Sequence, residues 1–129
     1  MSPRTGIELK WLPTMNCRRG DVVLVLFPDS NLRTAKRRPA LVVQADRLGT
    51  GLPQSIVAMI TSNMSRAGHP SRVVVRVGAM DARGSGLLTD SVIMADNLAT
   101  IHESEIDRVI GALPDMGEVD AALRATLGL

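Results

Sequence analysis

Short runs of β-branched and apolar residues, several of them bounded by glycine or proline, recur along the first hundred positions of this chain. Residues 21–27 (DVVLVLF) form one such run, which starts after Gly20 and stops before Pro28. A run of this length and composition is typical of a β-strand. By the same criteria we expect further strands at residues 40–44, 55–60, 72–77, 87–88, 90–94 and 100–102.

The last quarter of the chain has a different period. Ile106, Val109, Ile110 and Leu113 recur at helical spacing, which predicts a helix with its cap near Ser104. Residues 116–127 predict a second amphipathic helix. Several short strands followed by helices indicate an α+β fold, with a small curled sheet or barrel and carboxy-terminal helices.

The length of 129 residues fits one domain. Residues 1–16 contain two prolines and show no clear period, so we expect an amino-terminal arm there, followed by one domain over residues 17–129. Hydrophobic residues make up 45% of the chain and charged residues 22%, which is typical of a globular protein.

The composition also argues against several classes of protein. The single cysteine, Cys17, cannot form an intrachain disulfide or a thiolate zinc site, which favours a reducing compartment. No apolar stretch approaches the roughly 20 residues that span a bilayer, and the first residues do not resemble a signal peptide. We expect a cytoplasmic protein with no membrane partner. Neither metal-ligand spacing nor a glycine-rich phosphate loop is apparent, so we expect no metal and no cofactor.

Charge is distributed unevenly along the chain. Residues 1–50 hold nine basic and four acidic side chains, a net +5, whereas residues 51–129 hold six and nine, a net −3. A basic front half favours a polyanion such as nucleic acid as partner. A solvated basic loop is the alternative.

Four segments together resemble motifs of one bacterial family. In chain order they read RGDVV at residues 19–23, RPALVVQ at 38–44, AMITSN at 58–63 and, more weakly, DSVIMADNLATI at 90–101. Their order and spacing are similar to those of the MazF/PemK/Kid toxins, the mRNA interferases of type II toxin–antitoxin systems. The resemblance extends from about Arg18 to the carboxy-terminal helix.

This resemblance implies both a fold and an activity. The fold would be an SH3-like antiparallel barrel, as in MazF and CcdB, and the active form a homodimer. The implied activity is metal-independent, sequence-specific cleavage of single-stranded RNA, notably mRNA. The 2′-hydroxyl attacks the phosphate and leaves a 2′,3′-cyclic phosphate and a 5′-hydroxyl. The implied partners are a MazE-like antitoxin, whose disordered tail covers the RNA groove, and operator DNA, bound by the toxin–antitoxin complex.

Two residues take the family's catalytic positions by this resemblance. Arg38 is the catalytic arginine, and its planar guanidinium matches two phosphate oxygens. Thr61 is the catalytic threonine, whose hydroxyl can donate to a phosphoryl oxygen or hold the 2′-hydroxyl in line. Ser62 can add a donor. The alternatives are a surface arginine at the start of a strand and a β-branched residue at the end of one.

Other residues are candidates for RNA binding and proton transfer. Arg33, Lys36 and Arg37 would form a phosphate-binding rim, or else a solvated loop. Asp96 and Asn97 could read base edges, with turn formation as the alternative. His69 is a candidate for proton transfer, and arginine-assisted or water-mediated transfer is the fallback.

A second class of function remains open on the same fold. A non-catalytic toxin similar to CcdB, or a nucleic-acid-binding module, would need no cleavage site. The presence of both Arg38 and Thr61 argues against it, as does a carboxy terminus without the Trp-Gly-Ile ending of the CcdB poisons.

Overall fold

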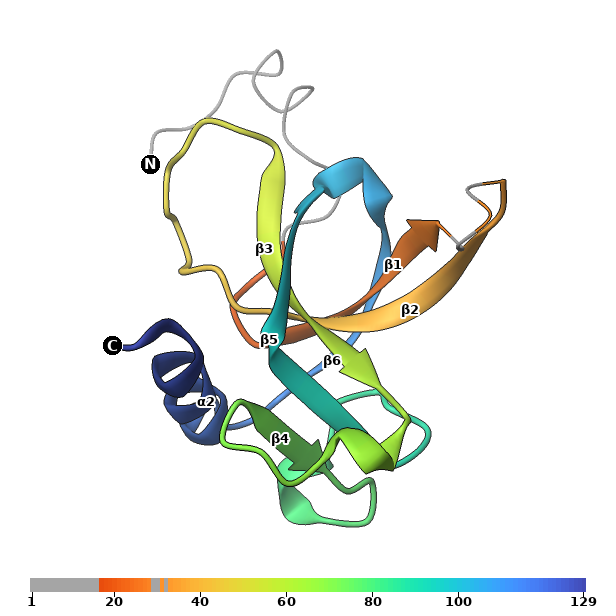
Figure 1. Ribbon diagram of the computed structural model, residues 1–129. Coiled ribbons are helices and arrows are strands. Elements are labelled where there is room, and N and C mark those ends of the chain that lie inside the picture. The colour runs from red at the N-terminus through yellow and green to blue at the C-terminus, as the bar shows by residue number, and fades with distance from the viewer. Residues whose placement is uncertain (1–16, 29–30, 32) are drawn as a thin grey trace.

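The computed structural model describes residues 17–28, 31 and 33–129 (Figure 1). The predicted arm, residues 1–16, lies outside the described residues. One antiparallel sheet has the strand order β4-β5-β3-β2-β1-β6. Its strands are β1 (Asp21–Pro28), β2 (Ala35–Val42), β3 (Gln54–Thr61), β4 (Arg72–Val75), β5 (Ser91–His102) and β6 (Ile106–Ala112). The helices are the 3-10 turns η1 (Met64–Arg66), η2 (Met80–Ala82) and η3 (Glu103–Glu105), and the α-helix α2 (Gly117–Leu127).

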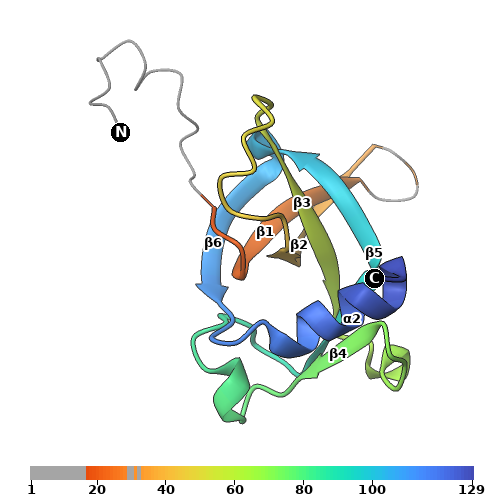
Figure 2. The same ribbon diagram turned by 90° about the vertical axis from the view of Figure 1, so that its left-hand side faces the viewer.

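The curled sheet buries apolar side chains on both of its faces. One cross-strand row, Val22, Leu41 and Ala58, belongs to the core that also includes Val119 and Ala122 of α2. Figure 2 shows α2 lying beside β4 at one end of the curled sheet. The adjacent row belongs to a second core, which contains Val23, Ala40 and Met59. Because successive strand residues point to opposite faces, strands buried on both sides read as continuous apolar runs. The predicted α+β fold is confirmed.

Strand β5 joins segments that the sequence suggested were separate. The predicted strands at residues 90–94 and 100–102 are the two ends of β5, which a register shift divides. Met59 pairs with Met94, whereas the neighbouring Ala58 pairs with Leu98. This irregularity lets the first half of β5 pair with β4 and β3, and the second half with β3 alone.

The predicted helix over residues 106–113 is wrong, because this segment is strand β6. β6 pairs with β1, and two register shifts interrupt the ladder. Val109 pairs with Val23 and Gly111 with Val22, so Ile110 is an additional residue at the first shift. An extra residue in a strand converts a spacing of two into a spacing of three. The bulged strand therefore imitates the i, i+3, i+4 pattern of a helix. Only α2 of the two predicted carboxy-terminal helices is found.

Strand β2 begins five residues earlier than predicted, at Ala35 rather than Ala40. The ladder with β1 continues through Phe27–Lys36 to Pro28–Ala35, so the basic residues before Pro39 lie on a long hairpin. The predicted strand at residues 87–88 is instead loop. In the described part of the chain, no helix has the length and apolarity needed to cross a membrane.

Candidate active site

A cleft of about 610 Å³ opens where β2, β3 and β6 meet the loop between β4 and β5. The first wall comes from β2 and the end of β3, and it includes Lys36, Arg37, Arg38, Thr61 and Ser62. The second wall comes from the loop residues 86–89 and from Arg108 and Ile110 of β6. Leu24 and Pro39, which are paired across β1 and β2, lie between the two walls.

The antiparallel register of β2 and β3 brings Arg38 and Thr61 to this cleft. The ladder runs through the pair Ala40 and Met59, and Arg38 and Thr61 each lie two residues beyond it on their strands. A common register therefore brings both residues to the same end of the sheet. The two predicted catalytic residues, which are 23 positions apart in the chain, line one cleft.

The hydroxyl of Thr61 is held by the backbone. The Asn63 N–H donates to Thr61 Oγ1 at 3.1 Å, so an oxygen lone pair is engaged while the hydroxyl proton remains available. Arg38 is exposed, and its guanidinium makes no hydrogen bond or ion pair with the described part of the chain. Among the residues that the structure describes, the Arg38 guanidinium and the Thr61 hydroxyl therefore have no internal acceptor and can donate to a ligand.

The electrostatics of the cleft favour an anion. Four basic side chains line it, whereas no aspartate, glutamate or histidine is among its described lining residues. Arg37 is partly neutralised, because its Nε lies 3.1 Å from Oδ2 of Asp107. The other three basic residues, Lys36, Arg38 and Arg108, have no such ion pair within the described residues. A concave site with one sign of charge concentrates ligands of the opposite sign.

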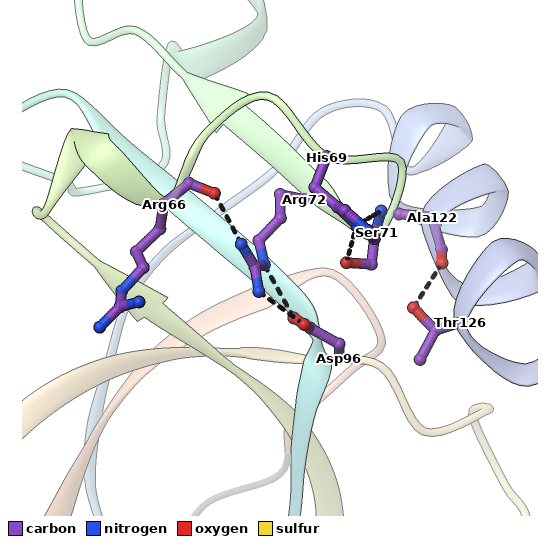
Figure 3. Close-up of polar contacts among 7 residues, drawn as sticks. All are labelled: Arg66, His69, Ser71, Arg72, Asp96, Ala122 and Thr126. Atoms are coloured by element: carbon purple, nitrogen blue, oxygen red, sulfur yellow. Dashed lines mark hydrogen bonds and ion pairs between the residues drawn. The ribbon is translucent and has the colours of Figure 1, made fainter.

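Several predicted site residues do not line this cleft. Arg33 is exposed ahead of β2, and Asn97 is exposed on β5. His69 and Asp96 lie together elsewhere, around the start of β4 (Figure 3). Ser71 donates its backbone N–H to His69 Nδ1 at 3.1 Å, and the Ser71 hydroxyl lies 2.7 Å from the same nitrogen. The structure therefore does not bring His69 to Arg38 and Thr61 for proton transfer.

Asp96 is held by a bidentate ion pair. Arg72 donates from Nε to Oδ1 at 3.0 Å and from Nη2 to Oδ2 at 2.7 Å, and its Nη1 donates to the carbonyl of Arg66 at 2.9 Å (Figure 3). These hydrogen bonds lower the pKa of the Asp96 carboxyl. In this chain the carboxylate secures β5 to β4.

This ion pair predicts a pH-dependent contribution to stability. A lowered pKa in the folded state stabilises the protein above the unfolded pKa, and this contribution is lost as pH falls through the folded value. We expect Asp96→Asn to lower the free energy of unfolding modestly at pH 7, because the pair is partly exposed. The deficit should shrink below about pH 4. Urea unfolding from pH 7 to pH 3 measures it, and a constant deficit would contradict this role.

Arg108 and Leu88 were missed as site residues. Arg108 lay inside the segment predicted as a helix, and Leu88 inside a predicted short strand. One signal was available: Gly111 and the β-branched pair Val109–Ile110 are poor helix formers, and they argue for a strand at residues 106–112.

The cysteine lies outside the cleft and is not activated. Burial, followed by the nearby carboxylates of Asp21 and Glu103, raises the pKa of the Cys17 thiol to about 11. A thiol with such a pKa is a poor nucleophile at neutral pH. Across the described residues, no three His, Cys, Asp or Glu side chains form a group that could hold a metal ion.

Comparison with known proteins gives consistent matches. The family model described as "PemK-like, MazF-like toxin of type II toxin-antitoxin system" matches residues 18–127. Endoribonuclease MazF6 of Mycobacterium tuberculosis is 36% identical over 107 residues, covering 81% of this chain and 90% of the relative. Endoribonuclease EndoA of Bacillus subtilis is 35% identical over 118 residues, covering 89% and 97%.

Solved structures share the fold. The M. tuberculosis toxin MazF-mt6 superposes with a TM-score of 0.66 at 25% identity, covering 84% of this chain and 97% of that one. A MazE–MazF structure from Deinococcus radiodurans gives a TM-score of 0.66 at 23% identity, covering 88% and 96%.

Proposed function

Because this chain belongs to the PemK-like, MazF-like toxins of type II toxin–antitoxin systems and is an endoribonuclease of that family, we propose that it cuts RNA in the cleft that holds Arg38 and Thr61. The observation that carries this proposal is the meeting of these two residues, from separate strands, in a cationic cleft. Unpaired donors there can meet charge that develops on a phosphate.

Cleavage would proceed by attack of the 2′-oxygen on the adjacent phosphorus. The new bond joins the 2′-oxygen to phosphorus as the bond to the 5′-oxygen breaks, which leaves a 2′,3′-cyclic phosphate and a 5′-hydroxyl. The Arg38 guanidinium donates to two non-bridging oxygens, and the Thr61 hydroxyl donates to one of them. Since neither a carboxylate nor a histidine is among the described residues of the cleft, water takes the 2′ proton and supplies the proton to the 5′-oxygen.

Neighbouring residues would bind the flanking RNA. Lys36 and Arg37 lie on the same strand as Arg38 and line the same cleft, so they suit phosphates on either side of the scissile one. Ser62 adds a hydroxyl beside Thr61. Arg33 lies nearby in the chain, on the approach to this strand. The substrate would be single-stranded RNA, including mRNA. The backbone of a base-paired helix holds the 2′-oxygen out of line with the phosphorus and the leaving 5′-oxygen, whereas an unpaired strand can adopt that alignment.

The same charge suits a protein partner. An acidic segment of a MazE-like antitoxin would compete with RNA for the cationic cleft. We further propose a homodimeric toxin, operator DNA as a ligand of the toxin–antitoxin complex, and a cytoplasmic location, where transcripts are available. The solved relatives include toxins bound to an antitoxin, and this supports the antitoxin proposal.

Substitutions of Thr61 test the proposed role of its hydroxyl. We expect Thr61→Ala to lower kcat by roughly ten- to thirtyfold, because a neutral donor contributes about half the free energy of a charged one. Thr61→Ser keeps the hydroxyl and should retain most activity, whereas Thr61→Val keeps the shape and should match alanine. The assay uses labelled single-stranded RNA in EDTA, and the fragment ends are identified by treatment with polynucleotide kinase. Fragments with 3′-hydroxyl ends, or a fully active Thr61→Val, would overturn the assignment.

A further inference from the structure

The wall of the cleft opposite Arg38 and Thr61 contains a cation that the proposed cleavage does not use. Arg108 is exposed, lines the cleft and has no ion pair within the described residues. It is paired with Leu24 on β1, which in turn is paired with Pro39 on β2. Arg108 is therefore two strands from the residue that follows Arg38, and both arginines line one cleft.

A β-bulge places Arg108 in this position. Arg108 pairs with Leu24 and Ile106 with Val25, so Asp107 is an extra residue between them. Asp107 binds Arg37, whereas Arg108 lines the cleft and has no ion pair with the described part of the chain. Bulges commonly re-aim side chains beside active sites. In this bulge the Asp107 carboxylate neutralises Arg37 of the first wall, and the next residue, Arg108, adds a cation to the second wall.

An exposed leucine lies on the same wall. Leu88 lines the cleft and is 93% exposed, the most exposed of the large hydrophobic residues in the described part of the chain. The loop that carries it is fixed, because the Ala112 N–H donates to the Gly84 carbonyl at 2.9 Å and Leu87 N–H donates to the hydroxyl of buried Ser85 at 3.2 Å. An apolar side chain and a cation in one cleft suit a ligand with both a flat apolar face and a negative charge.

We propose that this second wall binds a nucleotide adjacent to the scissile linkage, with Arg108 contacting its phosphate and Leu88 packing against its base. The proposal rests on the proposed function, because it takes the cleft to be the RNA site. A nucleotide is the favoured occupant since it combines the anion and the flat apolar surface in one unit. The described lining of the cleft contains no aromatic residue, so Leu88 takes the place of the stacking platform that single-strand binders use.

Binding of an uncleavable oligonucleotide tests the two contacts separately. The probe is a fluorescent RNA with 2′-deoxyribose at the cleaved position, and affinity is measured by anisotropy. We expect Arg108→Gln to weaken binding about five- to twentyfold and to reduce the slope of log K against log salt by about 0.7, the value for one phosphate contact on a single strand. We expect Leu88→Ala to weaken binding about three- to tenfold without changing that slope. Arg124→Gln, which removes an exposed arginine of α2, is the control and should change neither quantity.

An abasic scan then identifies the nucleotide. At one position near the cleavage site, removal of the base should abolish the loss of affinity caused by Leu88→Ala. The loss of affinity caused by Arg108→Gln should remain at that position. The proposal is overturned if both variants bind the RNA like the wild type. It is also overturned if the loss of affinity caused by Leu88→Ala persists at every abasic position. It is also overturned if the variants weaken only antitoxin binding, which would make the occupant a peptide. Because the probe is not cleaved, these results do not depend on Arg38 and Thr61 being catalytic, and a failure of the proposed function is seen separately in the cleavage assay.

Discussion

Replacement of Arg38 with alanine is expected to lower the rate of RNA cleavage by about 10²–10³-fold, the range typical for loss of one well-placed donor to a transition-state anion. The expectation is large because Arg38 is exposed and has no partner within the described residues, so its charge is not offset by an internal carboxylate. A single-turnover assay with saturating enzyme measures the chemical step, and circular dichroism and thermal unfolding show whether the fold is retained.

Two further variants separate the geometry of Arg38 from its charge. Arg38→Lys keeps the charge but loses the planar fork, so we expect it to recover only a small part of the lost rate. Arg83→Ala removes an exposed arginine outside the cleft and should cleave like the wild type. Addition of guanidinium ion to Arg38→Ala should restore some activity if the missing group acts on the phosphate. An Arg38→Ala enzyme that cleaves at the wild-type rate would place the reaction elsewhere.

The first wall of the cleft could be predicted from the sequence because it lies on regular strands. The runs at residues 40–44 and 55–60 are short and apolar, so the sequence predicts strand ends near Arg38 and Thr61. The sequence did not show how β2 and β3 are registered. That pairing was supplied by resemblance to a family, and the structure then placed the two residues in one cleft.

The second wall could not be predicted, and the reason is physical. Bulges at Asp107 and Ile110 remove the alternation that reveals a strand, so the sequence pattern around Arg108 predicts a helix. The position of Leu88 depends on a contact between two backbones about 25 residues apart, and a periodicity argument contains no information about such a contact. His69 illustrates the converse error: a histidine close in the chain to Thr61 lies outside the cleft and bonds to Ser71.

A substitution at Gly86 is expected to cause a large loss of stability, because Gly86 lies against the backbone of Ile110 in β6. Gly86 has φ +77°, and a Cβ there would lie 2.2 Å from the carbonyl oxygen of Ile110 and 2.7 Å from its carbonyl carbon. These obstacles are backbone atoms of β6, so a rotamer change cannot relieve the overlap. The left-handed conformation costs an L-residue roughly 1–2 kcal/mol, and overpacking typically adds about 1–3 kcal/mol. We therefore expect Gly86→Ala to lower the free energy of unfolding by about 2–5 kcal/mol.

Alanine substitutions at three other glycines separate the cost of the left-handed conformation from the cost of the overlap. Gly84 has φ +82° but open space around its Cβ position, so Gly84→Ala should show the conformational cost alone, about 1–2 kcal/mol. Gly78 has neither a positive φ nor a neighbour within 4 Å, and Gly78→Ala should be close to neutral. Gly111 has no positive φ, but its Cβ would lie 2.2 Å from the Gly84 carbonyl oxygen, so Gly111→Ala should show the cost of overlap alone, about 1–3 kcal/mol. Urea unfolding of the four variants gives the comparison. Equal losses of stability in Gly86→Ala and Gly84→Ala would show that the loop is not closely packed against β6. The position of Leu88 would then need another explanation.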